Sequence, residues 1–140
     1  MEQLTIFTDG GARGNPGPAA IGVFIKKGEE EIVRIGLKIG ETTNNVAEYT
    51  SILKAYEYCL ENKNTIYGVS QINFFMDSEL AVRPLNGIYK MKSPKLRELL
   101  FEIKKYEQKL SAIKIYYMHI PRELNKIADS LVNLALDNKL

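Results

Sequence analysis

The sequence has only one cysteine and one histidine among its 140 residues, and it has no long apolar run. A single cysteine, Cys59, cannot form an intramolecular disulfide or supply a zinc site built from several cysteines. This usage fits a reducing compartment. No apolar stretch approaches the roughly 18 residues of a membrane span, and residues 1–7 lack the long apolar core of a signal peptide. We therefore expect a cytoplasmic protein with no membrane partner.

The chain also has little net charge, but the charge it has is unevenly distributed. A net charge of +2 does not by itself mark a nucleic-acid-binding domain, because such domains are usually more basic. Between Lys90 and Lys114, however, eight cations and three anions leave a local net charge of +5. The commoner explanation is a solvated helix face, and the alternative is a surface that faces phosphates. Length and composition predict one globular domain over residues 1–140, without repeats or linkers.

Hydrophobic periodicity and turn residues predict an α/β fold with a mixed sheet and helices packed on it. The expected strands are residues 4–8, 19–27, 31–39, 72–76 and 112–120, and the expected helices are residues 46–62, 78–83, 94–110 and 121–137. In the third strand, Val33, Ile35, Leu37 and Ile39 should share one face, and Gly40 should end it. The order of elements is βββαβααβα.

Four acids occupy positions where the pattern favours apolar or neutral residues. Asp9 and Asp77 follow apolar strands, and ligands gather at strand ends in open α/β sheets. Glu48 lies on the inward stripe of the first helix, which continues with Ile52, Ala55 and Cys59. Asp129 lies in the last helix. Seventeen acids are present and most acids are surface groups, so any one of these four alone is more simply explained as structural.

Several carboxylates brought close together repel one another and take up protons unless a cation joins them. Oxygen ligands in a chain with one cysteine and one histidine suit Mg²⁺ or Mn²⁺ better than Zn²⁺. Two such ions can activate water and stabilise a leaving oxygen in phosphodiester cleavage.

Five segments together resemble type 1 ribonuclease H, and they run along the whole chain. They are residues 8–11 (TDGG), 14–18 (GNPGP), 42–48 (TTNNVAE) and 76–78 (MDS), and His119 with residues 121–129 (PRELNKIAD). The resemblance implies a ribonuclease H-like fold, with a five-stranded mixed sheet and helices on both faces. It also implies endonucleolytic hydrolysis of the RNA strand of RNA–DNA hybrids, which leaves 5′-phosphate and 3′-hydroxyl ends.

The resemblance further assigns roles to individual residues. Asp9, Glu48, Asp77 and Asp129 match the catalytic acids that hold two Mg²⁺ ions, which Mn²⁺ should replace. One ion would position the attacking water and the other would stabilise the departing 3′ oxygen. The residues that match substrate-binding positions are Gly10, Gly11, Asn15, Thr43, Asn44, Asn45, Ser78 and Asn125.

Among those positions, the asparagines at 15, 44 and 45 would contact the minor groove, where 2′-hydroxyls distinguish RNA from DNA. Thr43 would grip a phosphate of the DNA strand. The alternative for the residues at the helix start is ordinary helix capping, and both roles can coexist.

The sequence departs from the best-known family pattern at its histidine. His119 lies ten residues before Asp129, close to the spacing of a family histidine that assists product or metal release, and imidazole suits proton transfer near neutral pH. The family pattern surrounds that histidine with a flexible glycine-containing loop. Residues 117–121 instead predict a strand that runs directly into a helix, so a catalytic and a structural role both remain open.

A second departure concerns substrate grip. Residues 86–92 form only a short connection, which is typical of the compact form without a basic protrusion. The first strand begins at once, so we expect no N-terminal hybrid-binding domain. The partner should be an RNA–DNA hybrid, bound with strong salt dependence, and the protein should be a monomer without an obligate protein partner.

Three alternatives compete with a hybrid-specific nuclease. The first is a related enzyme of the same fold that acts on another nucleic acid, such as a junction resolvase, an integrase core or an exonuclease. The second is a non-catalytic nucleic-acid-binding module, and the third is an α/β domain with some other ligand. The asparagine pair before Glu48 disfavours the first alternative, and the presence of all four acids disfavours the second.

Overall fold

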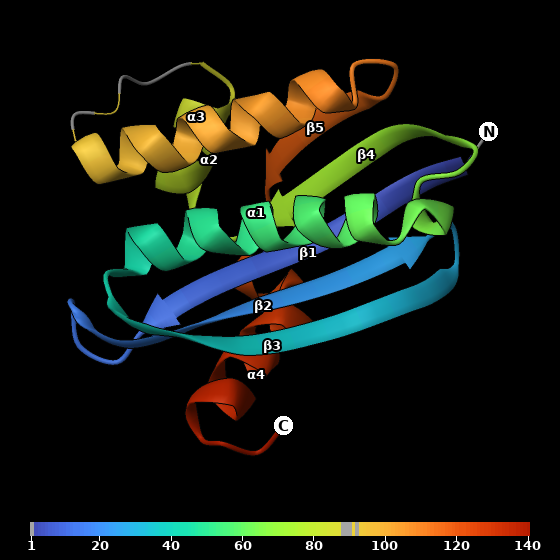
Figure 1. Cartoon of the computed structure of the whole chain (residues 1–140). Coiled ribbons are helices and arrows are strands. Elements are labelled where there is room, and N and C mark those ends of the chain that lie inside the picture. The colour runs from blue at the N-terminus through green and yellow to red at the C-terminus, as the bar shows by residue number, and fades with distance from the viewer. Residues whose placement is uncertain (1, 88–90, 92) are drawn as a thin grey trace.

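The computed structural model describes residues 2–87, 91 and 93–140, and it has the predicted mixed sheet covered on both faces by helices (Figure 1). The strands of the described chain are β1 (Glu2–Ala12), β2 (Gly17–Lys27), β3 (Glu30–Thr42), β4 (Val69–Met76) and β5 (Lys114–His119). The helices are α1 (Asn44–Glu61), α2 (Glu79–Leu85), α3 (Pro94–Lys109) and α4 (Lys126–Leu136), with 3₁₀ turns η1 (Lys63–Thr65) and η2 (Arg122–Leu124). Among these residues no helix is long and apolar enough to cross a membrane.

The sheet is five-stranded in the described chain, with the order β3-β2-β1-β4-β5. Strands β1, β2 and β3 form antiparallel hairpins, whereas β1, β4 and β5 are parallel. The carboxyl ends of β1 and β4 therefore lie at the same end of the sheet. Pairing of β1 with β4 stops at Phe7 and Phe75, so the last residues of β1 extend beyond β4 and pair with β2 alone.

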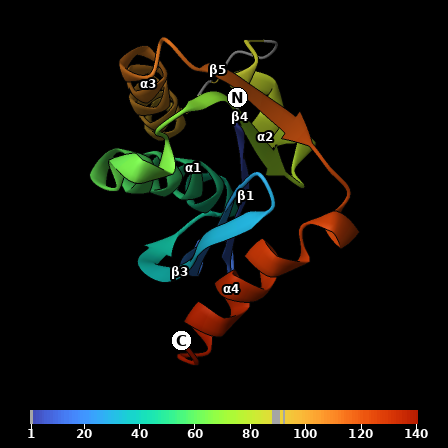
Figure 2. The same cartoon turned by 90° about the vertical axis from the view of Figure 1, so that its right-hand side faces the viewer.

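Helices α1 and α3 cover one face of the sheet, and α4 covers part of the other (Figure 2). The main core lies between α1 and the sheet. As the periodicity predicted, Ile52, Ala55 and Cys59 of α1 are fully buried. They pack in one cluster with strand residues such as Ile6 and Phe74. This packing holds α1 at a defined height above β1.

Two glycines allow the helices to approach the sheet closely, one on each face. A Cβ atom on Gly10 of β1 would lie 2.3 Å from the carbonyl carbon of Ala47 in α1. A Cβ atom on Gly22 of β2 would lie 2.2 Å from the carbonyl oxygen of Ala128 in α4. Neither position has room for a side chain. Since Ala47 and Ala128 immediately precede Glu48 and Asp129, these two contacts determine how close both acids come to the sheet.

The third strand differs from its predicted pattern. It continues past Gly40 to Thr42, and its pairing with β2 skips Ile39, which is a β-bulge. Val33 and Ile35 pack against the core as expected, but Leu37 is 44% exposed. A strict alternation does not hold along an edge strand whose register shifts.

The strand and helix ends near the acids also differ from prediction. Strand β1 runs on to Ala12, so Asp9 lies within it rather than at its end. Pro121 does not start the last helix, because the 3₁₀ turn at Arg122–Leu124 comes first and α4 begins at Lys126. The short helix α2 includes Pro84 instead of ending before it.

Candidate active site

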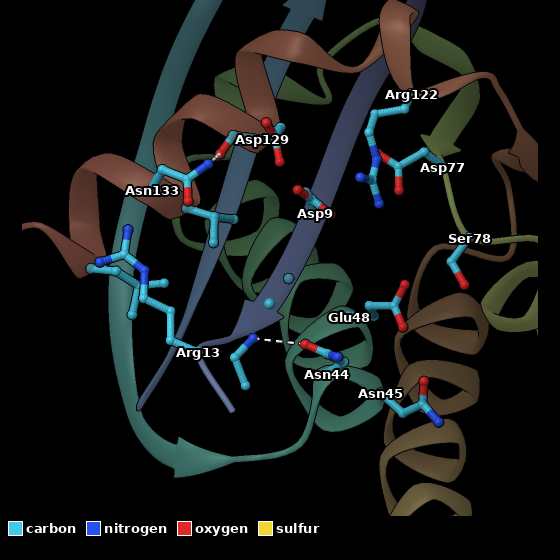
Figure 3. Close-up of a pocket in the computed structure, with 15 residues that line it drawn as sticks. Asp9, Arg13, Asn44, Asn45, Glu48, Asp77, Ser78, Arg122, Asp129 and Asn133 are labelled. Carbon is cyan, nitrogen blue, oxygen red and sulfur yellow. Dashed lines mark hydrogen bonds between the residues drawn. The ribbon is translucent and has the colours of Figure 1, made fainter. Parts of the chain in front are cut away.

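The four acids predicted from the sequence line a single cavity of about 460 Å³ (Figure 3). Asp9 comes from β1, Glu48 from the start of α1, Asp77 from the residue after β4, and Asp129 from the first turn of α4. The cavity lies at the end of the sheet where β1 extends beyond β4. Residues separated by up to 120 positions in sequence therefore share one opening.

Burial and mutual repulsion make it costly to ionise all of these acids at once. Burial raises the pKa of Asp9 to about 8, and the charges of Asp77, Asp129 and Glu48 add to this, against a lowering by the Gly10 backbone N–H. Burial also raises the pKa of Glu48 to about 7; the Ser78 hydroxyl works in the opposite direction, and the charge of Asp77 adds to the increase. Near neutral pH the pocket therefore favours protons or a bound cation.

The carboxylates do not by themselves form a complete metal-binding cage. Among the described residues, no group of three or more acidic, histidine or cysteine side chains is arranged to hold a metal ion. The donors present are carboxylate oxygens, which suit a hard divalent cation that completes its coordination with water and phosphate oxygens. The donor set thus fits an ion held jointly by protein and substrate.

Five of the eight predicted substrate-binding residues also line the cavity: Gly10, Gly11, Asn44, Asn45 and Ser78. Of the other three, Asn15 lies outside the cavity lining but hydrogen-bonds to Asn44, which is part of it. Asn15 Oδ1 accepts a hydrogen bond from the Asn44 backbone N–H at 3.0 Å, and Asn44 Oδ1 accepts one from the Ala12 N–H at 2.8 Å. These bonds join the turn after β1 to the start of α1.

Two hydroxyl residues cap the helices that border the cavity. The Thr43 hydroxyl accepts from the Val46 N–H at 3.3 Å and caps α1. The Ser78 hydroxyl accepts from the Ala81 N–H at 3.3 Å and caps α2. The capping predicted for the start of α1 is thus confirmed for Thr43, while the proposed phosphate contact of Thr43 stays a prediction.

His119 and Asn125 lie outside the cavity lining. His119 is the exposed last residue of β5, and it pairs with Met76, the residue before Asp77. This places it beside the acid cluster without making it part of the wall. Asn125 is 1% exposed, and its side chain lies beneath the site rather than facing the cavity.

Sequence reasoning missed two arginines and an asparagine that line the cavity. Arg122 comes from the 3₁₀ turn before α4 and lies beside Asp77, while Arg13 and Asn133 lie at the opposite side (Figure 3). Arg13 is also paired with Asp137 at 2.6 Å. Arg122 lies within the motif that identified Asp129. The sequence predicted a helix from Pro121 onward, but a 3₁₀ turn precedes α4 instead, and this turn places Arg122 in the cavity wall.

The basic segment between Lys90 and Lys114 is only partly free to face phosphates. In α3, Lys104 pairs with Glu107 and Lys105 pairs with Glu102. Lys90 and Lys92, with most of the short connection at 86–92, lie outside the described residues. For Lys104 and Lys105, these ion pairs favour the solvated helix face.

Comparisons with known proteins identify the family to which this fold and this cavity belong. Residues 7–135 match the family model described as "Reverse transcriptase-like". The solved structure of LC11-RNase H1, isolated from compost by a metagenomic approach, is 42% identical with a TM-score of 0.90, and the match covers 99% of this chain and 98% of that one. A structure of LC11-RNase H1 in complex with an RNA/DNA hybrid has a TM-score of 0.87 at 96% and 97% coverage.

Relatives in sequence give the same family. Ribonuclease HI of Halobacterium salinarum is 35% identical over 133 residues, 94% of this chain and 63% of that protein. The bifunctional protein Rv2228c of Mycobacterium tuberculosis is 34% identical over 137 residues, 96% of this chain but only 36% of that protein. The chain therefore belongs to the ribonuclease H family, in its type 1 branch, and spans about a third to two thirds of these two relatives.

Proposed function

We propose that this protein is a divalent-metal-dependent endonuclease that hydrolyses the RNA strand of RNA–DNA hybrids and leaves 5′-phosphate and 3′-hydroxyl ends. The observation that carries the proposal is the convergence of Asp9, Glu48, Asp77 and Asp129 on one open cavity. The relationship to a ribonuclease H1 whose structure contains an RNA/DNA hybrid supports the choice of substrate.

The four acids would hold two Mg²⁺ ions, or Mn²⁺ in their place, together with oxygens of the scissile phosphate. When bound, these ions supply Lewis-acid activation of water and stabilisation of the departing 3′ oxygen. The chain's own contribution is the arrangement of negative charge. Carboxylates from four separate parts of the chain surround the cavity, so a cation that enters it offsets the burial and the mutual repulsion that raise the pKa values of Asp9 and Glu48.

The walls of the cavity would orient the substrate. Asn44 and Asn45 lie on the α1 side, where their amides suit minor-groove contacts that include 2′-hydroxyls. Arg122 and Arg13 contribute positive charge at two positions of the rim, which suits the flanking phosphates. These contacts offset the acidic floor, which would otherwise repel a polyanion.

The experiment is a cleavage assay on a hybrid with labelled RNA, run with Mg²⁺, with Mn²⁺ and with chelator. Cleavage should require the metal, and Asp77→Asn should abolish it because one metal-holding carboxylate is lost. Glu98→Gln, which removes an exposed acid on α3, is the matched control and should cut like the wild type. Cleavage that persists in chelator or in Asp77→Asn would contradict the proposal.

Substrate comparison tests the main alternative, a ribonuclease H-fold enzyme with another target. Duplex RNA, duplex DNA and branched DNA should each be cut far more slowly than the hybrid under the same conditions. Preferential cutting of branched DNA would favour a resolvase. Binding of the hybrid without cleavage of any substrate would favour a non-catalytic module.

A further inference from the structure

Asn125 occupies an unusual position at the start of α4. It is the N-cap residue of that helix, where an asparagine oxygen commonly accepts a hydrogen bond from the first turn. Here the side chain makes no capping bond. Its Oδ1 atom is buried and has no hydrogen-bond partner among the described residues. A buried acceptor without a partner destabilises a fold. A capping bond would have satisfied this oxygen, so an interaction other than capping must fix the orientation of the amide.

The nitrogen of the same amide makes two hydrogen bonds. Asn125 Nδ2 donates to the Thr8 carbonyl oxygen at 3.0 Å and to Asp77 Oδ2 at 3.1 Å. Both partners are acceptors, so only the nitrogen of the amide can satisfy them, and this orientation leaves the oxygen without a partner. Thr8 precedes Asp9 and lies just past the last pairing of β1 with β4. The amide therefore binds β1 where β4 no longer pairs with it.

One side chain thus connects three elements that carry acids of the cavity. It binds β1 beside Asp9 and the Asp77 carboxylate after β4. It also belongs to the start of α4, where the Asp129 backbone N–H donates to the Asn125 carbonyl oxygen at 3.1 Å. Carboxylates that bind metal ions are commonly held by such hydrogen bonds from behind. The bond from Asn125 to Asp77 Oδ2 fixes the orientation of this carboxylate, and hence the direction in which its oxygens can bind a cation.

We propose that Asn125 is a positioning residue that sets the relative placement of Asp9, Asp77 and Asp129 for cation binding, rather than a residue that contacts the nucleic acid. This inference rests on the proposed function only where it predicts a change in the rate of hybrid cleavage. Cation binding itself is measured without substrate.

The experiment compares wild type, Asn125→Ala and Asn125→Asp in the full chain. The first variant removes both donors, and the second keeps the shape but replaces the nitrogen with an oxygen. Mn²⁺ alone is titrated and its binding measured by electron paramagnetic resonance. Both variants should bind Mn²⁺ about 10- to 100-fold more weakly than wild type. In the cleavage assay kcat should fall at fixed Mg²⁺, while KM for the hybrid should change by less than about twofold.

A stability control separates positioning from a general loss of folding. Ile103 is fully buried in α3, away from the cavity, and Ile103→Val should lower the melting temperature without changing Mn²⁺ affinity. Mn²⁺ affinity that is unchanged in both Asn125 variants, or that also falls in Ile103→Val, would overturn the proposal. Failure of the wild type to cut the hybrid would instead count against the proposed function.

A measurement on the wild type keeps the test valid even if the variants do not fold. In ¹⁵N-correlated NMR spectra of the metal-free protein, the Asn125 side-chain NH₂ should exchange slowly with solvent, because the residue is buried and its NH₂ makes two hydrogen bonds. Its resonances should shift when Mg²⁺, a diamagnetic probe used instead of Mn²⁺, is titrated into this metal-free protein. A rapidly exchanging NH₂ group that does not respond to Mg²⁺ would overturn the proposal.

Discussion

Removal of the Asp9 charge should make the metal-free protein more stable near neutral pH. In the folded chain the pKa of Asp9 is raised from 3.8 to about 8, first by burial and then by Asp77 and Asp129. Between these two values the folded state holds a proton that the unfolded state has released. Unfolding therefore releases a proton, and the free energy of unfolding falls as the pH rises from about 4 to about 8.

The size of this effect follows from the linkage between proton binding and folding. Each tenfold change in acid dissociation constant corresponds to about 1.4 kcal/mol, so the full shift would lower the free energy of unfolding by about 6 kcal/mol. The cavity is open to water, which reduces the repulsion. We therefore expect the free energy of unfolding of the wild type to fall by about 2–3 kcal/mol between about pH 4 and about pH 8.

The assay is urea denaturation in chelator at about pH 5 and about pH 8. Asp9→Asn cannot ionise, so it should lose about 2 kcal/mol less than wild type over this interval and should be the more stable protein at pH 8. When Mg²⁺ is present instead of chelator, it should recover part of the stability of the wild type at pH 8, because it replaces the proton. Glu98→Gln, the exposed control, should follow the wild type. Equal pH dependence in wild type and Asp9→Asn would refute the reasoning.

Three further substitutions test other parts of the structure. Gly10→Ala should destabilise the protein by about 2 kcal/mol in thermal denaturation, because its Cβ would overlap the backbone of Ala47. Gly11→Ala is the control and should melt near the wild-type temperature, because its Cβ would meet only a Val132 side-chain carbon at 3.7 Å. Tyr117→Phe should cost about 1–3 kcal/mol in urea, because its buried hydroxyl bonds to both Tyr56 and Glu107; an unchanged midpoint would contradict this. His119→Ala should lower turnover at least about tenfold with near-normal hybrid binding, and an unchanged rate would assign His119 to structure.

Much of the fold could be predicted because its signals are local. The stripe of Ile52, Ala55 and Cys59 indicated α1 and its buried face, and the strand at 72–76 was visible as a short apolar run. The bulge at Ile39 could not be predicted, since it depends on how β3 pairs with β2. The continuation of β1 past Asp9 has a similar cause, because pairing with β2 extends a strand through residues that favour turns.

The acids of the site were found because each one breaks an apolar pattern or falls in a motif. The convergence of Asp9, Glu48, Asp77 and Asp129 on one cavity is confirmed by the structure, while their roles remain proposals. Asn125 shows what the sequence alone does not reveal. Its motif suggested a contact with substrate, but its burial and its two hydrogen bonds depend on the packing of β1, β4 and α4.

The central claim is that the four carboxylates jointly bind cations at the scissile phosphate of a hybrid. The most direct test is a crystal structure of the wild type with Mn²⁺ and a hybrid whose RNA linkage cannot be cleaved, in which the ions are located by their anomalous scattering. We predict two Mn²⁺ peaks in the cavity, each in contact with carboxylate oxygens and with a phosphate oxygen of the RNA strand. Mn²⁺ bound elsewhere, or a hybrid seated on another face, would contradict the account.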